Sequence, residues 1–563
     1  MKKHALISSR DNSSDIALIH PPYILHHKQY SIFPVPWNLD HIGSTSFIGR
    51  YPVGPSWNIP PAGFSTMKNF VESASGYSVR IYNLALLRSQ PSAALEGRFK
   101  DIYLKDKSII TNLTETASYR RISAYIEKIE ASLFAVDLHW IVYSQGAIET
   151  LRLIKKIHPR SYTLVGGLTA GYFKDQILRD NSFIDFLIAG DGCRPLLRLI
   201  QEIKNGKDFS QVPNLIYRQK NALAGGPKRF YNDFACCQSD QDTQVAFSRG
   251  CPLQCSTCGG ARYPNNLSRL DKEASVYSVE SIMRKLSNLA GRNAQGGRVS
   301  LCHDPFLTLG RKKWAILLDE IKRNNLGLSF LIEFFLPHTR QEILDIAQKL
   351  PGSQIHICPE SMDERVRAFH KNLRYSNKQL TMNMDTINQA DSLSMSIWFM
   401  SGLARDTQKS VDQTLSFIGD YYKKLKRKQD NLLSYNELLF VDPGSLAFEF
   451  PGKYGYKIIH KRFADYAQSF IMPVFKYQIN YETAYFNRGQ LFRLFLYMHD
   501  RMNSIYLKNN LISRQAYRRI RRYNYLLEKY EPDYDRAMQL LRLSLRQKRF
   551  KELGEKFTNE LRS

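Results

Sequence analysis

Three cysteines lie within eight residues of this sequence, in the segment Cys251-Pro-Leu-Gln-Cys255-Ser-Thr-Cys258. A short loop with this spacing can direct all three thiols toward one centre. A structural zinc site usually has four ligands, often as two separated pairs, and no second Cys-x-x-Cys or histidine pair follows nearby. Three thiolates on a [4Fe–4S] cluster leave one iron open, where a substrate can bind and accept an electron. The spacing therefore favours an iron–sulfur cluster over a zinc knuckle or a chance grouping.

The segment that carries these cysteines begins an alternating series of predicted strands and helices. Its first strand is VAFSRGC at 245–251, and later strands are predicted at 298–304, 328–335, 354–360, 395–403 and 433–440. Six strand–helix units over about 200 residues suit a partial (β/α)6 barrel. The cysteines follow the first strand, at the end where barrel enzymes place their chemistry. We therefore predict a barrel over residues 244–450.

The N-terminal part of the chain also alternates between strands and helices. Strands are predicted at 15–22, 77–87 and 133–142, with further short strands and helices up to residue 205. This pattern predicts an α/β fold with a Rossmann-like parallel sheet. Glycines follow several strand ends, at the crevice where open α/β sheets bind ligands. We predict a tail over 1–14, this domain over 15–205, a linker over 206–243 and an α-helical, basic C-terminal region over 451–563.

The Cys-x-x-x-Cys-x-x-Cys loop after the first barrel strand resembles the radical SAM superfamily. The preceding domain is similar to the cobalamin-binding domains that are fused to that barrel. The stretches that resemble B12-binding radical SAM proteins are VDLHW (136–140), VGGLTAGYF (165–173), HDPFLTLG (303–310), CPESMDERVRAFHK (358–371) and FVDPGSLAFEFPGKYGY (440–456). This resemblance implies three cofactors: a [4Fe–4S] cluster, S-adenosylmethionine and cobalamin.

By this resemblance, Cys251, Cys255 and Cys258 hold three irons of the cluster, and the fourth iron chelates S-adenosylmethionine. One electron, from a flavodoxin or ferredoxin, then cleaves the sulfonium to give methionine and a 5′-deoxyadenosyl radical. The radical takes a hydrogen atom from an unactivated carbon. The cofactors carry this chemistry, and the protein positions them and excludes water.

The resemblance also suggests which residues bind S-adenosylmethionine. Asp304 stands where a Gly-Gly-Glu stretch is common and is expected to accept from the amino group, with a helix-capping role as the alternative. Glu360 ends a strand and is expected to bind the ribose hydroxyls or to cap the next helix. Glu333 lies within an apolar strand, facing either the barrel interior or a wet face. Arg405 follows the next strand, where it binds a carboxylate or is simply exposed.

The cobalamin groove is less clearly marked. By resemblance, the residues expected to line it are His139, Gly166, Gly167, Thr169 and Gly190, with tight turns or structural roles as the alternative. Many cobalamin domains carry Asp-x-His-x-x-Gly after the first strand, where the histidine binds cobalt. Here Asp40-His41-Ile42-Gly43 has a different spacing. The sequence therefore does not predict a histidine ligand to cobalt.

Charge suggests a second class of partner. The chain has 79 Lys and Arg against 52 Asp and Glu, a net charge of +27, of which the 63 residues from Arg501 carry +9. Such a balance suits nucleic acid, an anionic surface or substrate, or a solvated basic surface. The segment YRRIRRYNYLLEKY (517–530) mixes arginine and tyrosine, which can bind RNA. A helix that packs its Tyr and Leu side chains on the barrel is the favoured alternative.

No stretch approaches the roughly 20 apolar residues of a membrane span, and MKKHALISSRDNSSD lacks an apolar region. We therefore expect a cytoplasmic protein. The favoured function is cobalamin-dependent methyl transfer to an unactivated carbon of a small molecule or natural product. Three alternatives stay open: rearrangement, cyclisation or sulfur insertion without methylation; a radical SAM enzyme that modifies RNA; and a non-catalytic iron–sulfur or cobalamin-binding regulatory protein.

Overall fold

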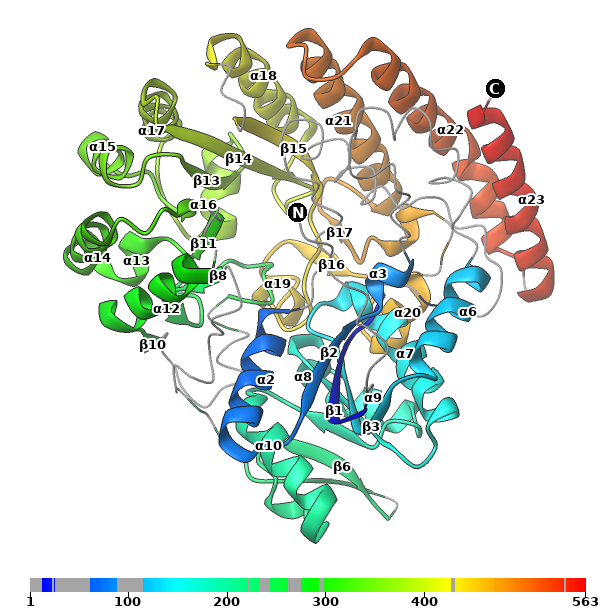
Figure 1. Ribbon diagram of the computed structural model, residues 1–563. Coiled ribbons are helices and arrows are strands. Elements are labelled where there is room, and N and C mark those ends of the chain that lie inside the picture. Colours follow the sequence, from blue (N-terminus) through cyan, green and yellow to red (C-terminus); the bar gives the residue numbers. More distant parts are fainter. Residues whose placement is uncertain are drawn as a thin grey trace.

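The computed structural model describes residues 13–22, 25, 61–88, 115–220, 222–229, 231, 244–261, 263, 275–292, 298–426, 431–470, 472, 474–540 and 543–562. These residues form an N-terminal α/β unit, a barrel-like unit and a helical C-terminal region (Figure 1). The segment Asp40–Gly43 and most of the predicted N-terminal tail lie outside the described residues.

The N-terminal unit is built on a seven-stranded sheet. Its strands are β1 (Ser13–His20), β2 (Val79–Asn83), β3 (Glu130–Asp137), β4 (Tyr162–Gly166), β5 (Phe186–Ile188), β6 (Leu215–Gln219) and β7 (Ala222–Gly225), in the order β2-β1-β3-β4-β5-β6-β7. The first five are parallel, which confirms the predicted Rossmann-like sheet. β6 and β7 extend it antiparallel, so the predicted linker over 206–243 is wrong for these residues.

Helices cover both faces of this sheet, which explains its nearly continuous apolar strands. One face packs on α2 (Ala62–Ser75) and α10 (Cys193–Gln201), and the other on α6 (Glu115–Ile126), α7 (Ser144–Ile157) and α9 (Lys174–Asp180). Alternate residues of β1 enter opposite cores: Ile16 and Leu18 face α2, whereas Ala17 and Ile19 face α6 and α7. The remaining short elements are α3 (Ala85–Arg88), η4 (Ile141–Tyr143), α8 (Leu168–Tyr172), η5 (Glu202–Gly206) and η6 (Phe209–Gln211).

The second unit has six parallel strands, as the sequence predicts. They are β8 (Gln244–Ala246), β11 (Arg298–Cys302), β12 (Ser329–Phe334), β13 (Ser353–Glu360), β14 (Leu393–Ser401) and β15 (Leu432–Leu438), paired in chain order. The predicted first strand is divided, because β9 (Ser248–Arg249) pairs antiparallel with β10 (Ser275–Val276). On β12, Phe330, Ile332 and Phe334 are buried in the core shared with the helices. Glu333 therefore points to the opposite face, the barrel interior.

Eight described helices belong to this unit; the long ones form its outer layer, whereas the last one lies beside the N-terminal unit (Figure 1). They are α12 (Val279–Arg292), α13 (Pro305–Thr308), α14 (Gly310–Asn324), α15 (Arg340–Lys349), α16 (Glu364–Lys371), α17 (Asn377–Gln389), α18 (Gln408–Lys424) and α19 (Leu446–Glu449). Capping boxes begin α15, α17 and α18, where Thr339, Ser376 and Thr407 each bond the backbone three residues on. These local signals fix where the helices begin.

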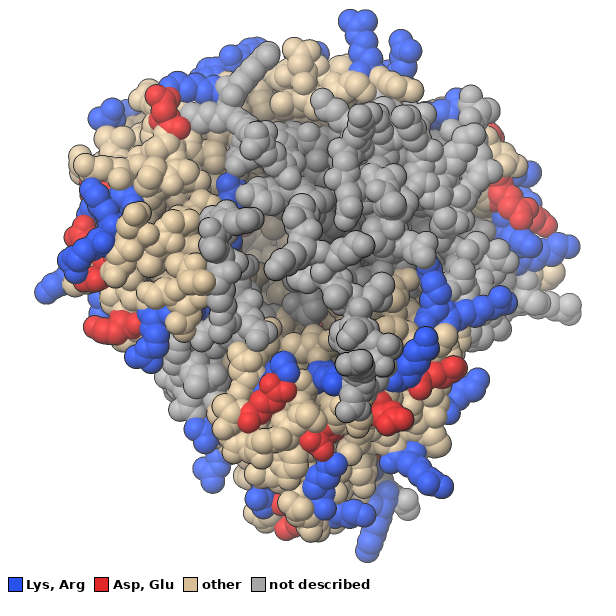
Figure 2. Space-filling view, in the orientation of Figure 1, with Lys and Arg blue, Asp and Glu red and all other residues tan. Residues whose placement is uncertain are grey.

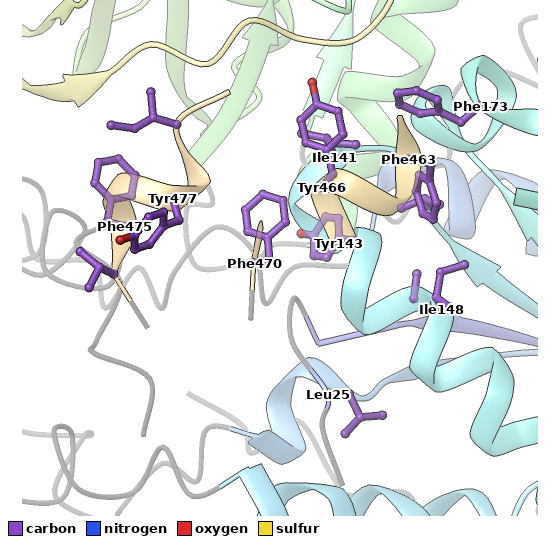
Figure 3. Close-up of a cluster of buried hydrophobic side chains, with 14 of the residues drawn as sticks. Leu25, Ile141, Tyr143, Ile148, Phe173, Phe463, Tyr466, Phe470, Phe475 and Tyr477 are labelled. Carbon is purple, nitrogen blue, oxygen red and sulfur yellow. The ribbon is translucent and has the colours of Figure 1, made fainter. Parts of the chain in front are cut away.

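The C-terminal region begins with a small hairpin rather than a helix. β16 (Tyr456–Ile458) pairs antiparallel with β17 (Tyr481–Thr483), and α20 (Phe463–Ser469) and η8 (Phe475–Gln478) lie between them. Figure 3 shows Phe463 and Tyr466 of α20 beside Ile141, Tyr143 and Phe173 of the N-terminal unit. This contact helps to fix the N-terminal unit against the C-terminal region.

Three long helices close the chain: α21 (Arg488–Lys508), α22 (Arg514–Met538) and α23 (Leu543–Arg562). In the segment 517–530, Tyr523, Leu526, Leu527 and Tyr530 are buried. The helix therefore buries its Tyr and Leu side chains as predicted, but it packs on α21 and α23 rather than on the barrel. On the face drawn in Figure 2, basic side chains are spread out and interspersed with acidic ones. In the part of the chain that the structure describes, no helix is long and apolar enough to cross a membrane.

Candidate functional site

Two adjoining cavities lie between the N-terminal unit and the barrel. The barrel cavity, of about 610 Å³, includes in its wall the three motif cysteines together with Cys302, His303, Glu333, Glu360, His370 and Lys371. The interdomain cavity, of about 310 Å³, is lined by His139, Leu168, Thr169, Gly171, Tyr172, Lys174, Gly259, Pro443, Gly444 and Glu449. Trp140, Ile141 and Asp442 line both cavities, so the two spaces share a wall.

The three cysteines predicted to hold a cluster all reach the barrel cavity. Burial raises the pKa of the Cys251 thiol, and it raises the pKa of Cys255 to about 12. Burial also raises the pKa of Cys258, although the Gly260 N–H donates to its Sγ at 3.3 Å. A bound metal deprotonates such thiols outright, so they suit a cationic centre.

The described residues hold no group of three or more His, Cys, Asp or Glu side chains set around the position of a single metal ion. A [4Fe–4S] cluster makes a different demand, since each of its thiolates binds a separate iron.

The loop that carries the cysteines is held by distant segments. The Ser256 N–H donates to the His370 carbonyl at 2.9 Å, at the end of α16. After β15, the Ala447 N–H donates to the Ser256 carbonyl at 2.7 Å, and the Asp442 N–H donates to the Thr257 carbonyl at 3.1 Å. These bonds fix the loop from two sides, so its thiols are positioned before any ligand binds.

Both predicted glutamates face the barrel cavity. Glu333 Oε2 accepts the His303 N–H at 2.7 Å, and burial raises the pKa of this carboxyl. Glu360 ends β13 with a φ of 67° and lies 3.1 Å from Lys371 Nζ, in an ion pair whose side chains are only 11% and 5% exposed. The structure thus brings two carboxylates and one ammonium group to the cavity that holds the cysteines. Their binding of S-adenosylmethionine stays a prediction.

Asp304 does not reach this cavity. It is fully buried, and its Oδ1 accepts the Phe306 N–H at 2.9 Å at the start of α13. Its Oδ2 accepts the Phe335 N–H at 2.8 Å and lies 3.0 Å from His338 Nε2. Both oxygens are therefore used inside the protein. The expected ligand role is corrected to the capping role that the sequence also allowed.

Arg405 is also absent from the cavity wall. Its side chain is exposed, and its guanidinium lies 3.8 Å from the centre of the Phe369 ring. The expectation that it binds a carboxylate of S-adenosylmethionine is corrected to the exposed loop position.

The polar residues of the barrel cavity that were not identified from the sequence include His370, Lys371 and Asp442. His370 Nδ1 lies 3.1 Å from Ser256 Oγ, and burial lowers its pKa to about 3, so the ring is neutral. Asp442 accepts the Gly259 N–H at 2.8 Å, and burial raises its pKa to about 6. All three lie in stretches that carry the family resemblance, but no local pattern marks which side chains turn inward.

The interdomain cavity has a different character. Its rim carries three exposed apolar side chains, Trp140, Leu168 and Tyr172. Glycines at 171, 259 and 444 also line it, so backbone forms part of the wall. An exposed apolar rim around a partly backbone-lined hollow suits a large, flat ligand.

The predicted groove residues divide into two sets. His139 and Thr169 line the interdomain cavity, in the loops that follow β3 and β4. Gly166, Gly167 and Gly190 are not part of its wall, and their role in binding cobalamin stays a prediction. Gly167 has a φ of 120°, and a Cβ there would lie 2.5 Å from the His139 backbone nitrogen. Glycine at 167 therefore permits the close approach of the two loops, as a tight turn.

No family model matches the chain. An anaerobic magnesium-protoporphyrin IX monomethyl ester cyclase of Rubrivivax gelatinosus is 22% identical over 305 residues, which are 49% of this chain and 52% of the cyclase. An uncharacterized methyltransferase of Pyrococcus horikoshii is 20% identical over 55% of this chain and 69% of that protein. The chain thus matches about half the length of the cyclase.

Solved structures extend the likeness to nearly the whole chain. The radical S-adenosylmethionine methyltransferase TsrM of Kitasatospora setae, with cobalamin and a [4Fe–4S] cluster bound, has a TM-score of 0.55 at 12% identity, over 97% of this chain and 99% of that one. The cobalamin-dependent radical enzyme OxsB, with aqua-cobalamin and S-adenosylmethionine bound, has a TM-score of 0.54 at 10% identity, over 93% and 73%. The chain therefore has the fold of the B12-binding radical SAM proteins, as its sequence resemblance implies.

Proposed function

We propose that this chain is a radical SAM enzyme that uses a [4Fe–4S] cluster, S-adenosylmethionine and cobalamin to methylate an unactivated carbon. One observation carries the proposal: the three motif thiols share a cavity with Glu333, Glu360 and Lys371, and that cavity shares a wall with the hollow at the edge of the N-terminal sheet.

The barrel cavity fits the first two cofactors. Cys251, Cys255 and Cys258 would hold the cluster, since all three thiols reach one space on a loop that is already fixed. Its volume of about 610 Å³ lies within the roughly 300–1,000 Å³ usual for small-molecule sites. Glu333 and Glu360 would accept hydrogen bonds from the amino group and the ribose hydroxyls of S-adenosylmethionine. Lys371 would fix Glu360 through their ion pair.

The interdomain cavity, of about 310 Å³, would contact one part of a corrin rather than enclose it. Trp140, Leu168 and Tyr172 offer an exposed apolar rim that a large ring system would cover. Cavity glycines let backbone approach such a ring closely. His139 also lines this wall.

When bound, the cofactors supply reductive cleavage of S-adenosylmethionine and a cobalt-borne methyl group. The chain contributes by positioning the cofactors and by excluding water from the site. The wall of the barrel cavity includes the apolar residues Met400, Leu403, Leu438, Leu439 and Phe440, which would limit the access of water to the reacting groups. These apolar walls favour a small organic substrate, such as a natural product, over RNA.

The test is anaerobic purification and reconstitution with iron, sulfide and cobalamin, followed by analysis of metals and products. We expect about four irons per chain, as a [4Fe–4S] cluster requires, and about one cobalt. With S-adenosylmethionine and a strong reductant, we expect both 5′-deoxyadenosine and S-adenosylhomocysteine. Deoxyadenosine alone supports rearrangement, cyclisation or sulfur insertion without methylation. Zinc in place of iron after reconstitution contradicts the proposal.

A matched pair of variants assigns the result to the motif. Cys255→Ala removes a proposed ligand, whereas Cys193→Ala changes a cysteine of α10 that lines neither cavity. Only Cys255→Ala should lose iron and deoxyadenosine formation. Equal losses in both variants would indicate misfolding rather than a missing ligand.

A further inference from the structure

A cluster of His20, Asp137 and His139 lies at the carboxyl edge of the N-terminal sheet. His20 is the last residue of β1, and Asp137 is the last residue of β3. After β1 the chain continues to β2, on one side of β1. After β3 it continues to β4, on the opposite side of the sheet order β2-β1-β3-β4. This topological switch point is where open α/β sheets place their ligands.

Asp137 binds both histidines. Its carboxylate oxygens lie 2.9 and 2.8 Å from His139 Nδ1, and it also accepts the His139 backbone N–H at 3.1 Å. His20 Nδ1 lies 3.3 Å from Asp137 Oδ2, and both side chains are buried, at 0% and 4% exposure. The Asp137 carboxyl group therefore accepts a hydrogen bond from Nδ1–H of each ring.

These bonds decide which nitrogen of His139 is available. With Nδ1–H donated to Asp137, Nε2 carries the lone pair. Among the residues that the structure describes, no side chain or backbone group bonds Nε2, and the side chain is 23% exposed on the wall of the interdomain cavity. The ring is also packed against Trp140 and Tyr143, with centroids 5.4 and 5.5 Å away. A carboxylate that orients a histidine in this way is the usual support of a metal-binding imidazole.

We propose that Nε2 of His139 would bind the cobalt of cobalamin when that cofactor occupies the interdomain cavity. Asp137 and His20 are positioning residues. The inference rests on the proposed function, because it names the protein ligand of that cofactor. The Nε2–Co bond forms as the bond from cobalt to the dimethylbenzimidazole of free cobalamin breaks, and no electron is transferred. Many cobalamin domains carry an Asp-x-His pair after the first strand, and this chain has a different spacing there. Asp137-Leu138-His139, at the end of the third strand, supplies such a pair instead.

The test is electron paramagnetic resonance of the full chain loaded with cob(II)alamin, prepared with natural-abundance and with nitrogen-15-labelled protein. An axial nitrogen splits each cobalt line, into a triplet for nitrogen-14 and a doublet for nitrogen-15. We expect the triplet to become a doublet when only the protein is labelled. A triplet in both samples would assign the ligand to the benzimidazole, and the absence of splitting would exclude any nitrogen ligand. Either result overturns the proposal, whereas failure to bind cobalamin overturns the proposed function instead.

Variants then identify the residue. His139→Ala should abolish the protein-derived splitting and weaken cobalamin binding by about 10- to 100-fold, and Asp137→Asn should keep the splitting but weaken binding by about tenfold. The control is His158→Ala, since His158 bonds the Ile126 carbonyl at 3.0 Å and lines neither cavity. Iron content should be equal in all of them, which shows that the barrel is intact. A doublet that persists in labelled His139→Ala would assign the ligand to another residue.

Discussion

The two cavities share a wall but differ in the groups that they present. The barrel cavity gathers the three motif thiols, three carboxyl groups and an ammonium group, and its central ion pair is almost completely shielded from water. The interdomain cavity has an exposed apolar rim, and its polar cluster of His20, Asp137 and His139 lies at its edge. Charges placed out of water interact strongly, whereas an exposed apolar rim gains from being covered. One space is therefore arranged for reactive charged groups and the other for seating a large ligand.

The largest expected effect is the loss of the cofactor of one cavity while the other cavity still binds its own. Cys255→Ala should reduce iron content and deoxyadenosine formation to background, because the other two thiols leave a cluster without a ligand. The same variant should bind cobalamin as the wild type does, since no motif cysteine lines the interdomain cavity. Iron analysis and cobalamin titration on one preparation check this. Loss of both cofactors would mean that the cavities form a single cooperative site.

The next effect concerns the buried charge of the barrel cavity. Lys371→Met leaves Glu360 as an unpaired buried carboxylate, which typically costs about 3–5 kcal/mol of unfolding free energy. The double variant Lys371→Met with Glu360→Gln removes both charges and should recover much of that loss. Denaturant unfolding of the three proteins measures the difference. If the single variant lost less than about 1 kcal/mol of unfolding free energy, water would have to reach the ion pair. That result would contradict the low exposure of its side chains.

The rim of the interdomain cavity should respond differently. Trp140→Ala removes an exposed side chain, so the free energy of unfolding should change by only about 0.5 kcal/mol. Cobalamin affinity should fall by about tenfold, equivalent to about 1.4 kcal/mol. Tyr485→Ala is the matched control, because Tyr485 is also an exposed aromatic residue but lines neither cavity. Equal affinities for the two variants would remove Trp140 from the binding surface.

The smallest effect is expected at Arg405. Arg405→Ala removes a guanidinium that stacks on Phe369, a contact of about 0.5–1 kcal/mol at an exposed site. The KM for S-adenosylmethionine should stay within about twofold of the wild type, since Arg405 is not in the cavity wall. A tenfold rise in KM, with an unchanged free energy of unfolding, would show that Arg405 belongs to the binding site. The barrel cavity would then extend beyond the wall described above.

The sequence by itself determined the features whose parts are close together along the chain. The three cysteines stand within one loop, so their spacing alone indicated a cluster. The strands and helices of both units follow from hydrophobic periods of two and 3.6 residues, which are local properties. The six barrel strands were predicted for this reason. The strands within residues 206–243 were missed because β6 and β7 are short and are followed by a Gly-Gly-Pro segment and polar sequence.

Only the tertiary structure decided which polar groups are free to bind a ligand. Asp304 Oδ2 is hydrogen-bonded to the Phe335 N–H and to His338 Nε2, about thirty residues later in the chain. No local sequence pattern shows these bonds. His139 became a candidate cobalt ligand because Asp137 holds Nδ1 at a switch point set by strand order. A side chain's partners depend on which strands are neighbours, and strand order is a property of the whole fold. The role of the cysteines could therefore be predicted from the sequence, whereas the role of the histidines could not.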